Sequence, residues 1–135
     1  MSHFTSVRTR LADREALIKG LADLGFANVE SHDEPQHLMG FQGDRRQQTA
    51  EVIIRRQYVG RMSNDIGFKL GPDGCFEAII SQFDRTKYHS QWLGSLCQRS
   101  AYHSTCAKLV EQGFDLVSQE QTQDGHVHMT LRRMV

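Results

Sequence analysis

The residues with the most chemical potential lie in one stretch, 86–112, which has the pattern of a long helix. Spacings of three and four residues place a set of its side chains on one stripe: His89, Trp92, Leu96, Arg99, His103, Cys106 and Val110. Much of the stripe is apolar, so we expect it to face the rest of the fold. Arg99 and His103 interrupt it one helical turn apart. A guanidinium there can bind an anion, and an imidazole can transfer a proton near neutral pH.

Arg99 needs a carboxylate partner if it is buried, because an unpaired buried charge is expensive. Asp65 and Glu77 lie on the hairpin expected to pack against this helix, with Asp65 the first choice. The predicted ligand-binding candidates are therefore Arg99, His103, Asp65, Tyr102 and Glu77. The structural alternative is a hydrogen-bonded core histidine beside an arginine that extends its charged end to the edge of the helix.

Two further imidazoles, those of His126 and His128, share one face of a predicted strand. This spacing can chelate zinc or copper, but a tight site needs three or four ligands. His3, near the amino terminus, is a further weak candidate for copper. No set of four ligands has a recognised spacing, so we expect no bound metal and no cofactor. The alternative for His126 and His128 is the exposed polar face of an edge strand.

Signatures of nucleophilic catalysis and of phosphate loops are missing. The glycines of 40–43 lack the Gly-Lys-Ser/Thr ending of a phosphate loop, and no Gly-x-Ser-x-Gly motif occurs. Cys106 follows His103 on a stripe expected to be buried, where a thiol usually packs. With Cys75 and Cys97 it makes an odd number of cysteines without CxxC spacing, which indicates free thiols in a reducing compartment.

Length and composition indicate one domain spanning 1–135. Charged residues make up 24% of the chain and hydrophobic residues 39%, which is ordinary for a globular protein. The formal net charge is zero, so nothing global directs the chain to nucleic acid or an anionic membrane. No secretory signal or membrane-spanning run is present, and we expect a soluble, cytoplasmic protein.

The elements that must position these residues follow from local patterns. Asp13 is a suitable N-cap and Gly25 a suitable stop for a helix over 13–24. The turn signal Gly71-Pro72-Asp73-Gly74 predicts a hairpin, and residues 32–48 are expected to be at least partly loop. The expected strands lie at 3–10, 26–31, 49–59, 65–70, 75–81, 114–120 and 127–133.

A weak internal repeat relates 21–29 to 109–117, since both read as a helix end, a glycine, a phenylalanine and a strand. Each half of the chain then has the order strand, helix, strand, strand. This predicts an α+β fold in which both helices cover one face of a largely antiparallel, ferredoxin-like sheet. The alternative is that this is simply a common way for a chain to leave a helix.

Four segments, in order along nearly the whole chain, carry a resemblance to a known family. They are Met1-Ser2-His3-Phe4, Asp65-Ile66-Gly67-Phe68, Gln98-Arg99-Ser100-Ala101-Tyr102-His103 and Glu111-Gln112-Gly113-Phe114. Together they resemble the hypothetical chloroplast open reading frame 35 family of cyanobacteria and algal plastids. The family pattern usually has Tyr where Asn64 stands, and other residue types at His126 and His128. The resemblance implies a photosynthetic cell, with a cytoplasmic or plastid stromal location, and no particular chemistry.

The leading prediction is a non-catalytic binding or assembly module that acts with a protein partner or by self-association. It rests on the lack of a strong catalytic signature and on the balanced charge. The alternative is a small enzyme or an anionic-ligand-binding protein that uses an Arg99/His103 pocket. A deep cleft lined by Arg99, His103 and Asp65 would favour the alternative, and a closed core there would favour the module.

Overall fold

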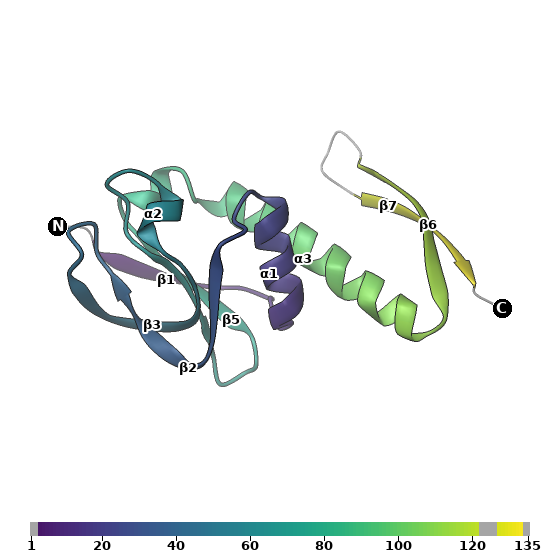
Figure 1. Cartoon of the computed structure of the whole chain (residues 1–135), viewed down its shortest axis with the longest axis horizontal. Coiled ribbons are helices and arrows are strands. Elements are labelled where there is room, and N and C mark those ends of the chain that lie inside the picture. The colour runs from purple at the N-terminus through teal and green to yellow at the C-terminus, as the bar shows by residue number, and fades with distance from the viewer. Residues whose placement is uncertain (1–2, 122–126, 134–135) are drawn as a thin grey trace.

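A five-stranded antiparallel sheet with two long helices makes up most of the chain (Figure 1). The computed structural model describes the backbone of residues 3–121 and 127–133 and the side chains of residues 3–113. The strand order is β1-β5-β4-β3-β2. In chain order the elements are β1 (Phe4–Arg8), α1 (Arg14–Asp23), β2 (Val29–Met39), β3 (Arg45–Ile54), α2 (Arg56–Val59), β4 (Ile66–Leu70), β5 (Phe76–Ser81), the 3-10 turn η1 (Asp84–Thr86), α3 (Ser90–Glu111), β6 (Phe114–Gln121) and β7 (Val127–Arg133).

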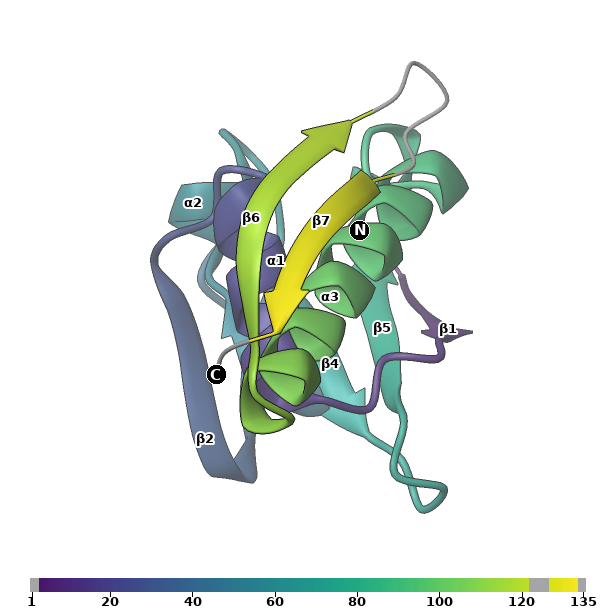
Figure 2. The same cartoon turned by 90° about the vertical axis from the view of Figure 1, so that its right-hand side faces the viewer.

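Helices α1 and α3 lie side by side over one face of the sheet (Figure 2). Leu17 and Leu21 of α1 and Leu96 of α3 are fully buried in the main core. From the sheet this core takes Val52, Ile54, Ile66, Phe68, Phe76, Ala78 and Ile80. Each buried large side chain contributes roughly 1.5–3 kcal/mol. The predicted α+β class, with an antiparallel sheet and both helices on one face, is confirmed.

Local signals predicted from the sequence set the ends of α1. The Asp13 carboxylate accepts a hydrogen bond from the Ala16 backbone N–H at 3.2 Å, as an N-cap should. Gly25, directly after the C-cap, has φ 101°, a left-handed conformation that glycine adopts without strain. These caps fix where α1 starts and stops.

The opposite face of the sheet is closed by the bent β2–β3 hairpin. A register shift in the β2–β3 pairing, between Ser31 and Gln36, bends β2 and lets it continue to Met39 where a loop was expected. A second core cluster there contains Leu38, Ala50, Ile53 and Ile79. Gly67 allows the hairpin to approach, because a Cβ at this position would lie 2.8 Å from the Ala50 Cβ.

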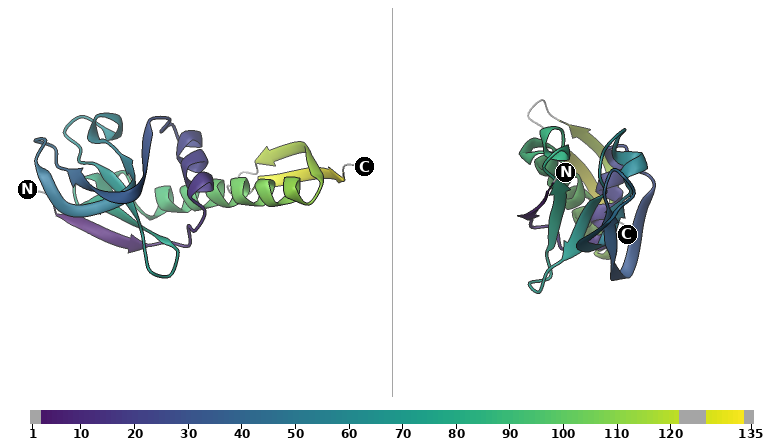
Figure 3. Two further views of the ribbon diagram at one scale, coloured as in Figure 1. Left: turned by 60° about the horizontal axis from the view of Figure 1, so that its bottom comes forward. Right: turned by 90° about the vertical axis from the view of Figure 1, so that its left-hand side faces the viewer.

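The last hairpin does not join the five-stranded sheet. β6 and β7 form a separate two-stranded sheet, which lies beside the C-terminal part of α3 and away from the five-stranded sheet (Figures 1 and 3). The order β5, α3, β6, β7 matches the second predicted half, but the two halves do not share one sheet. The helix-covered antiparallel sheet was therefore predicted correctly, whereas the arrangement of two strand-helix-strand-strand halves in one ferredoxin-like sheet was not.

Candidate functional site

Arg99 and His103 of α3 both bind the carboxylate of Asp23, the last residue of α1. The Asp23 Oδ2 atom lies 2.9 Å from Arg99 Nε and 2.6 Å from His103 Nε2. The Arg99 guanidinium also lies 4.8 Å from the centre of the Tyr102 ring, within range for a cation–π contact. The predicted carboxylate partner for Arg99 is thus present. Its predicted identity, Asp65 or Glu77, is wrong, because α1 and not the hairpin covers this part of α3.

The Asp23 cluster lies at the rim of the α1–α3 contact. The side chains of Arg99 and His103 are 22% exposed and that of Asp23 is 30% exposed. Partial burial disfavours the ionised carboxylate of Asp23, but hydrogen bonds from His103 and Arg99 outweigh it and lower its pKa. The cluster can therefore hold a carboxylate ionised against an imidazole and a guanidinium.

We expect the Arg99→Met variant to lose about 0–1 kcal/mol of stability at neutral pH, as is usual for ion pairs at a rim. A lowered folded-state pKa stabilises the fold above the unfolded-state pKa of about 4, and this contribution disappears as the pH falls through the folded-state value. The free energies of unfolding of the two proteins, measured in urea, should therefore differ near neutral pH and converge as the pH falls through the lowered folded-state pKa of Asp23. An equal difference at both pH values would indicate lost packing instead of lost charge.

The remaining predicted candidates lie elsewhere in the fold. Asp65 is fully buried just before β4. Glu77 lies on β5, where its carboxylate accepts a hydrogen bond from the Ser6 hydroxyl at 2.9 Å. The five candidates therefore do not form one site: Arg99, His103 and Tyr102 come together, and Asp65 and Glu77 each lie elsewhere. A ligand-binding role for them stays a prediction.

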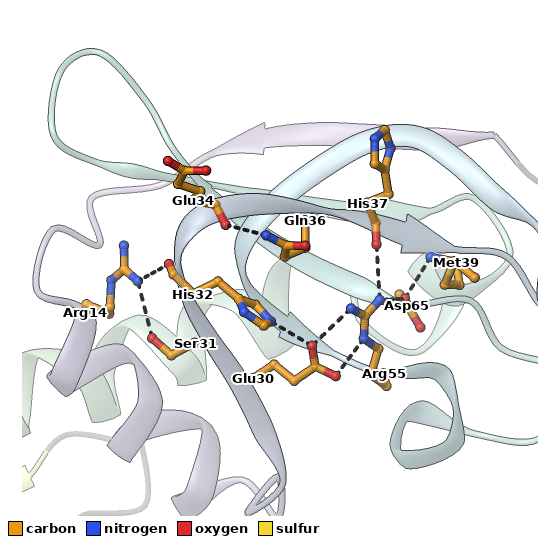
Figure 4. A network of polar contacts seen from close by, with 10 residues as sticks. All are labelled: Arg14, Glu30, Ser31, His32, Glu34, Gln36, His37, Met39, Arg55 and Asp65. Atoms are coloured by element: carbon orange, nitrogen blue, oxygen red, sulfur yellow. Dashed lines mark hydrogen bonds and ion pairs between the residues drawn. The ribbon is translucent and has the colours of Figure 1, made fainter.

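Arg55 is the centre of a polar network that the sequence analysis missed (Figure 4). Its guanidinium makes a bidentate interaction with the Glu30 carboxylate, with Nε 2.7 Å from Oε2 and Nη2 3.0 Å from Oε1. Its Nη1 atom donates to Asp65 at 2.8 Å and to the His37 carbonyl at 3.1 Å. Hydrogen bonds from Arg55 lower the pKa of Glu30, which also contacts His32 Nε2 at 2.8 Å. The network ties the edge strand β2 to the end of β3 and the start of β4.

Asp65 explains why the chain leaves the sheet after Ile54, where a strand was expected to continue to 59. Its Oδ1 atom accepts the Arg56 backbone N–H at 2.7 Å, at the start of α2. Its Oδ2 atom accepts the Met39 N–H, also at 2.7 Å. The carboxylate thus takes the place of strand pairing for two backbone groups.

A second buried polar group is built around Asp84, which is 3% exposed. Its Oδ2 atom accepts hydrogen bonds from the Ser81 hydroxyl at 2.7 Å and from the Asn64 backbone N–H at 3.0 Å. The Asn64 side chain donates to Ser81 Oγ at 2.9 Å and accepts from the Phe41 N–H at 3.0 Å. These contacts join the segment after α2 to the end of β5 and to η1.

Two cavities lie away from the Asp23 cluster. One, of about 570 Å³, lies between the segment before α1 and the side of α3. The other, of about 330 Å³, is lined by Gln36, His37, Met39, Arg45 and Arg55. Neither is lined by Arg99 or His103.

Metal-ligating side chains do not gather in the described part of the chain, where no group of three or more His, Cys, Asp or Glu residues has a suitable arrangement. Among the weak candidates, His3 is exposed. His126 lies outside the described residues, and His128 lies in β7, where only the backbone is described. None of the three cysteines, Cys75, Cys97 and Cys106, takes part in a disulfide, and burial raises the pKa of Cys97.

Comparison with known proteins places these features among relatives of unknown function. Residues 20–130 match a family described as "Protein of unknown function (DUF1257)". The uncharacterized protein ycf35 of Cyanophora paradoxa is 26% identical over 136 residues, with 98% of each chain covered. The protein of the same name from Pyropia yezoensis is 25% identical over 138 residues, again with 98% of each chain covered. No solved structure matches the chain. Among the described residues, no helix is long and apolar enough to cross a membrane.

Proposed function

The chain belongs to the DUF1257 family of proteins of unknown function, and from this premise we propose that it is a non-catalytic assembly module of photosynthetic cells. We infer that it associates with a second copy of itself through α3 and the β6–β7 hairpin. The ycf35 relatives confirm the resemblance to the hypothetical chloroplast open reading frame 35 family, which carries no established activity. Support for assembly therefore comes from the fold, in particular from α3 and the β6–β7 hairpin.

The observation that carries the proposal is the separate two-stranded sheet of β6 and β7. A two-stranded hairpin alone is marginally stable in water and gains stability from further strands or a packed face. Within the described chain no third strand pairs with either of them, so both edges keep backbone groups available for pairing. A second hairpin added at one edge would complete a four-stranded sheet.

The C-terminal half of α3 offers the surface beside this hairpin. The buried residues of α3 are Leu93, Leu96 and Ser100, all in its first half. The helix then continues past α1 and the five-stranded sheet (Figure 3). Val110 on this extension is 59% exposed. An exposed apolar side chain on the helix that leads into this hairpin suits a protein interface.

A second copy of the chain is the partner that suits this surface best. An antiparallel pair of identical edge strands has a two-fold axis, so the contact closes at a dimer. With 16 basic and 16 acidic residues, two copies carry no net charge and do not repel each other.

The non-catalytic part of the proposal is supported by how the chemically capable side chains are used. Arg99 and His103 are engaged with Asp23, and Arg55 with Glu30 and Asp65. An enzyme or anion-binding site at Arg99 and His103 has less support, because an anion there would compete with Asp23.

Sedimentation velocity of the full chain over about 1–100 μM should give a species of twice 15.4 kDa that dissociates on dilution. Val110→Lys places a charge on the proposed face and should raise the dimer Kd at least tenfold, which corresponds to about 1.4 kcal/mol. Leu70→Lys, at another exposed apolar position near the β4–β5 turn, should leave the Kd unchanged. A monomer at every concentration, or equal effects of the two variants, would contradict the proposal.

A further inference from the structure

The cavity of about 570 Å³ between the start of α1 and the side of α3 has the size of a small-molecule site. Its walls include Leu11, Ala16 and Ala101, which supply apolar surface. Leu11 and Ala16 are buried, so this part of the wall belongs to the folded core and does not depend on a mobile surface loop. The cavity can therefore enclose an apolar body of several carbon atoms.

The polar side chains of the cavity favour an anion. Arg10 and Lys108 both line it, and neither forms an ion pair with an acidic side chain in the described part of the chain. Ser104 and Thr105 add hydroxyl groups on the α3 side. The one acidic residue of the wall, Asp13, accepts the Ala16 N–H at the start of α1. The wall therefore carries two exposed cationic side chains, Arg10 and Lys108, and one carboxylate, which already accepts a backbone N–H.

Ser100, at the same wall, is 4% exposed, and its hydroxyl has no hydrogen-bond partner in the described structure. Its Oγ atom has almost no accessible surface, so it faces the contact between the helices and not the cavity. Ser100 also lies at the closest approach of the helices, where a Cβ on Gly20 would be 2.7 Å from Ser100 Oγ.

We propose that this cavity binds a small organic anion, a carboxylate or phosphate monoester carried on an apolar chain. The apolar chain lies against Leu11 and Ala101. Arg10 and Lys108 hold the anionic group, and the hydroxyls of Ser104 and Thr105 donate to it or to the adjoining polar atom. The α3 residues of the site extend from Cys97 to Lys108 and so reach into the helix half proposed for assembly. Anion binding and self-association are therefore read out separately, by amide shifts and by sedimentation, and Val110→Lys should leave anion binding unchanged.

The test is a titration of the full-length, ¹⁵N-labelled protein with octanoate, octyl phosphate and octanol, followed by amide chemical shifts. At least one anion should shift amides near 10–16 and 97–108 saturably, and octanol should bind at least tenfold more weakly. Arg10→Gln and Lys108→Gln should each weaken the anion at least fivefold, while Lys87→Gln, an exposed cation outside the cavity, should not. Ser100→Ala should leave binding unchanged, because the Ser100 hydroxyl faces α1 and not the cavity.

The relative affinities of octanoate and octyl phosphate identify the anionic group. No saturable shift with any of the three compounds would overturn the proposal. Equal affinity for octanol and octanoate would also overturn it, as would affinities that Arg10→Gln and Lys108→Gln leave unchanged.

Discussion

Replacing Asp65 with alanine is expected to lower the free energy of unfolding by about 3–5 kcal/mol, the range for removing one member of a buried ion pair. Asp65 has 0% exposure, and its two oxygens accept the N–H groups of Met39 and Arg56 and a guanidinium N–H of Arg55. The alanine variant leaves all of these donors short of an acceptor in a place that water reaches poorly.

Urea unfolding and amide hydrogen exchange measure this effect. The Met39 and Arg56 amides should lose protection in Asp65→Ala, because each donates directly to the carboxylate. Glu30→Ala is the matched control, since it removes the other carboxylate on Arg55 from a side chain that is 38% exposed. It should cost only about 0–1 kcal/mol. Similar losses in the two variants would contradict a structural role for the buried carboxylate.

Structural features that depend on neighbouring residues were predicted correctly from the sequence. The N-cap at Asp13, the stop at Gly25 and the hairpin around 71–74 depend on neighbouring residues, and the structure contains all three. The stripe of α3 was predicted from its spacing alone, and Arg99 and His103 do share one contact. The expected burial of this stripe is correct for Leu96 but wrong for Val110, which is 59% exposed on the part of α3 beyond α1. Such features are local, so one sequence is enough to find them.

The partners of these residues could not be predicted in the same way. Helical spacing says which side chains share a stripe, but not which element covers it, so Arg99 was paired with Asp65 in place of Asp23. No partner was predicted for Arg55 or Arg56, although Asp65 accepts hydrogen bonds from both residues. A signal was available, because the apolar run of β3 stops at Ile54 and an acid precedes the next strand. Its meaning depends on contacts between residues far apart in the chain.

The position of the last hairpin relative to the five-stranded sheet also could not be predicted from local sequence patterns. Alternation along 114–120 and 127–133 predicted two paired strands, and the structure has them. Alternation does not say which sheet a hairpin joins, because a strand has the same period in any sheet. The repeat between 21–29 and 109–117 led to one sheet for both halves, and the second hairpin instead lies apart.

Asp84→Ala is the second substitution with a large expected effect, a loss of about 2–4 kcal/mol in the free energy of unfolding. Asp84 is 3% exposed, and no cationic side chain in the described structure pairs with it. Its Oδ2 atom instead accepts the Ser81 hydroxyl and the Asn64 backbone N–H. Alanine would leave both donors buried without an acceptor, and each such group costs about 1–3 kcal/mol.

Asp84→Asn is the matched control, because it keeps the shape and one acceptor oxygen and should cost about half as much or less. The loss should also reach the contact next to it, where the Tyr88 hydroxyl donates to the Val59 carbonyl at 3.0 Å. Tyr88 packs at 5.0 Å from the Trp92 ring near the start of α3, so loosening this segment should change Trp92 fluorescence before global unfolding. If the alanine and asparagine variants were equally stable, the acceptor oxygen that asparagine keeps would contribute nothing to stability. The proposed role of Asp84 as a hydrogen-bond acceptor would then be wrong. An unchanged fluorescence baseline in Asp84→Ala would show that the segment after α2 is held by its apolar contacts instead.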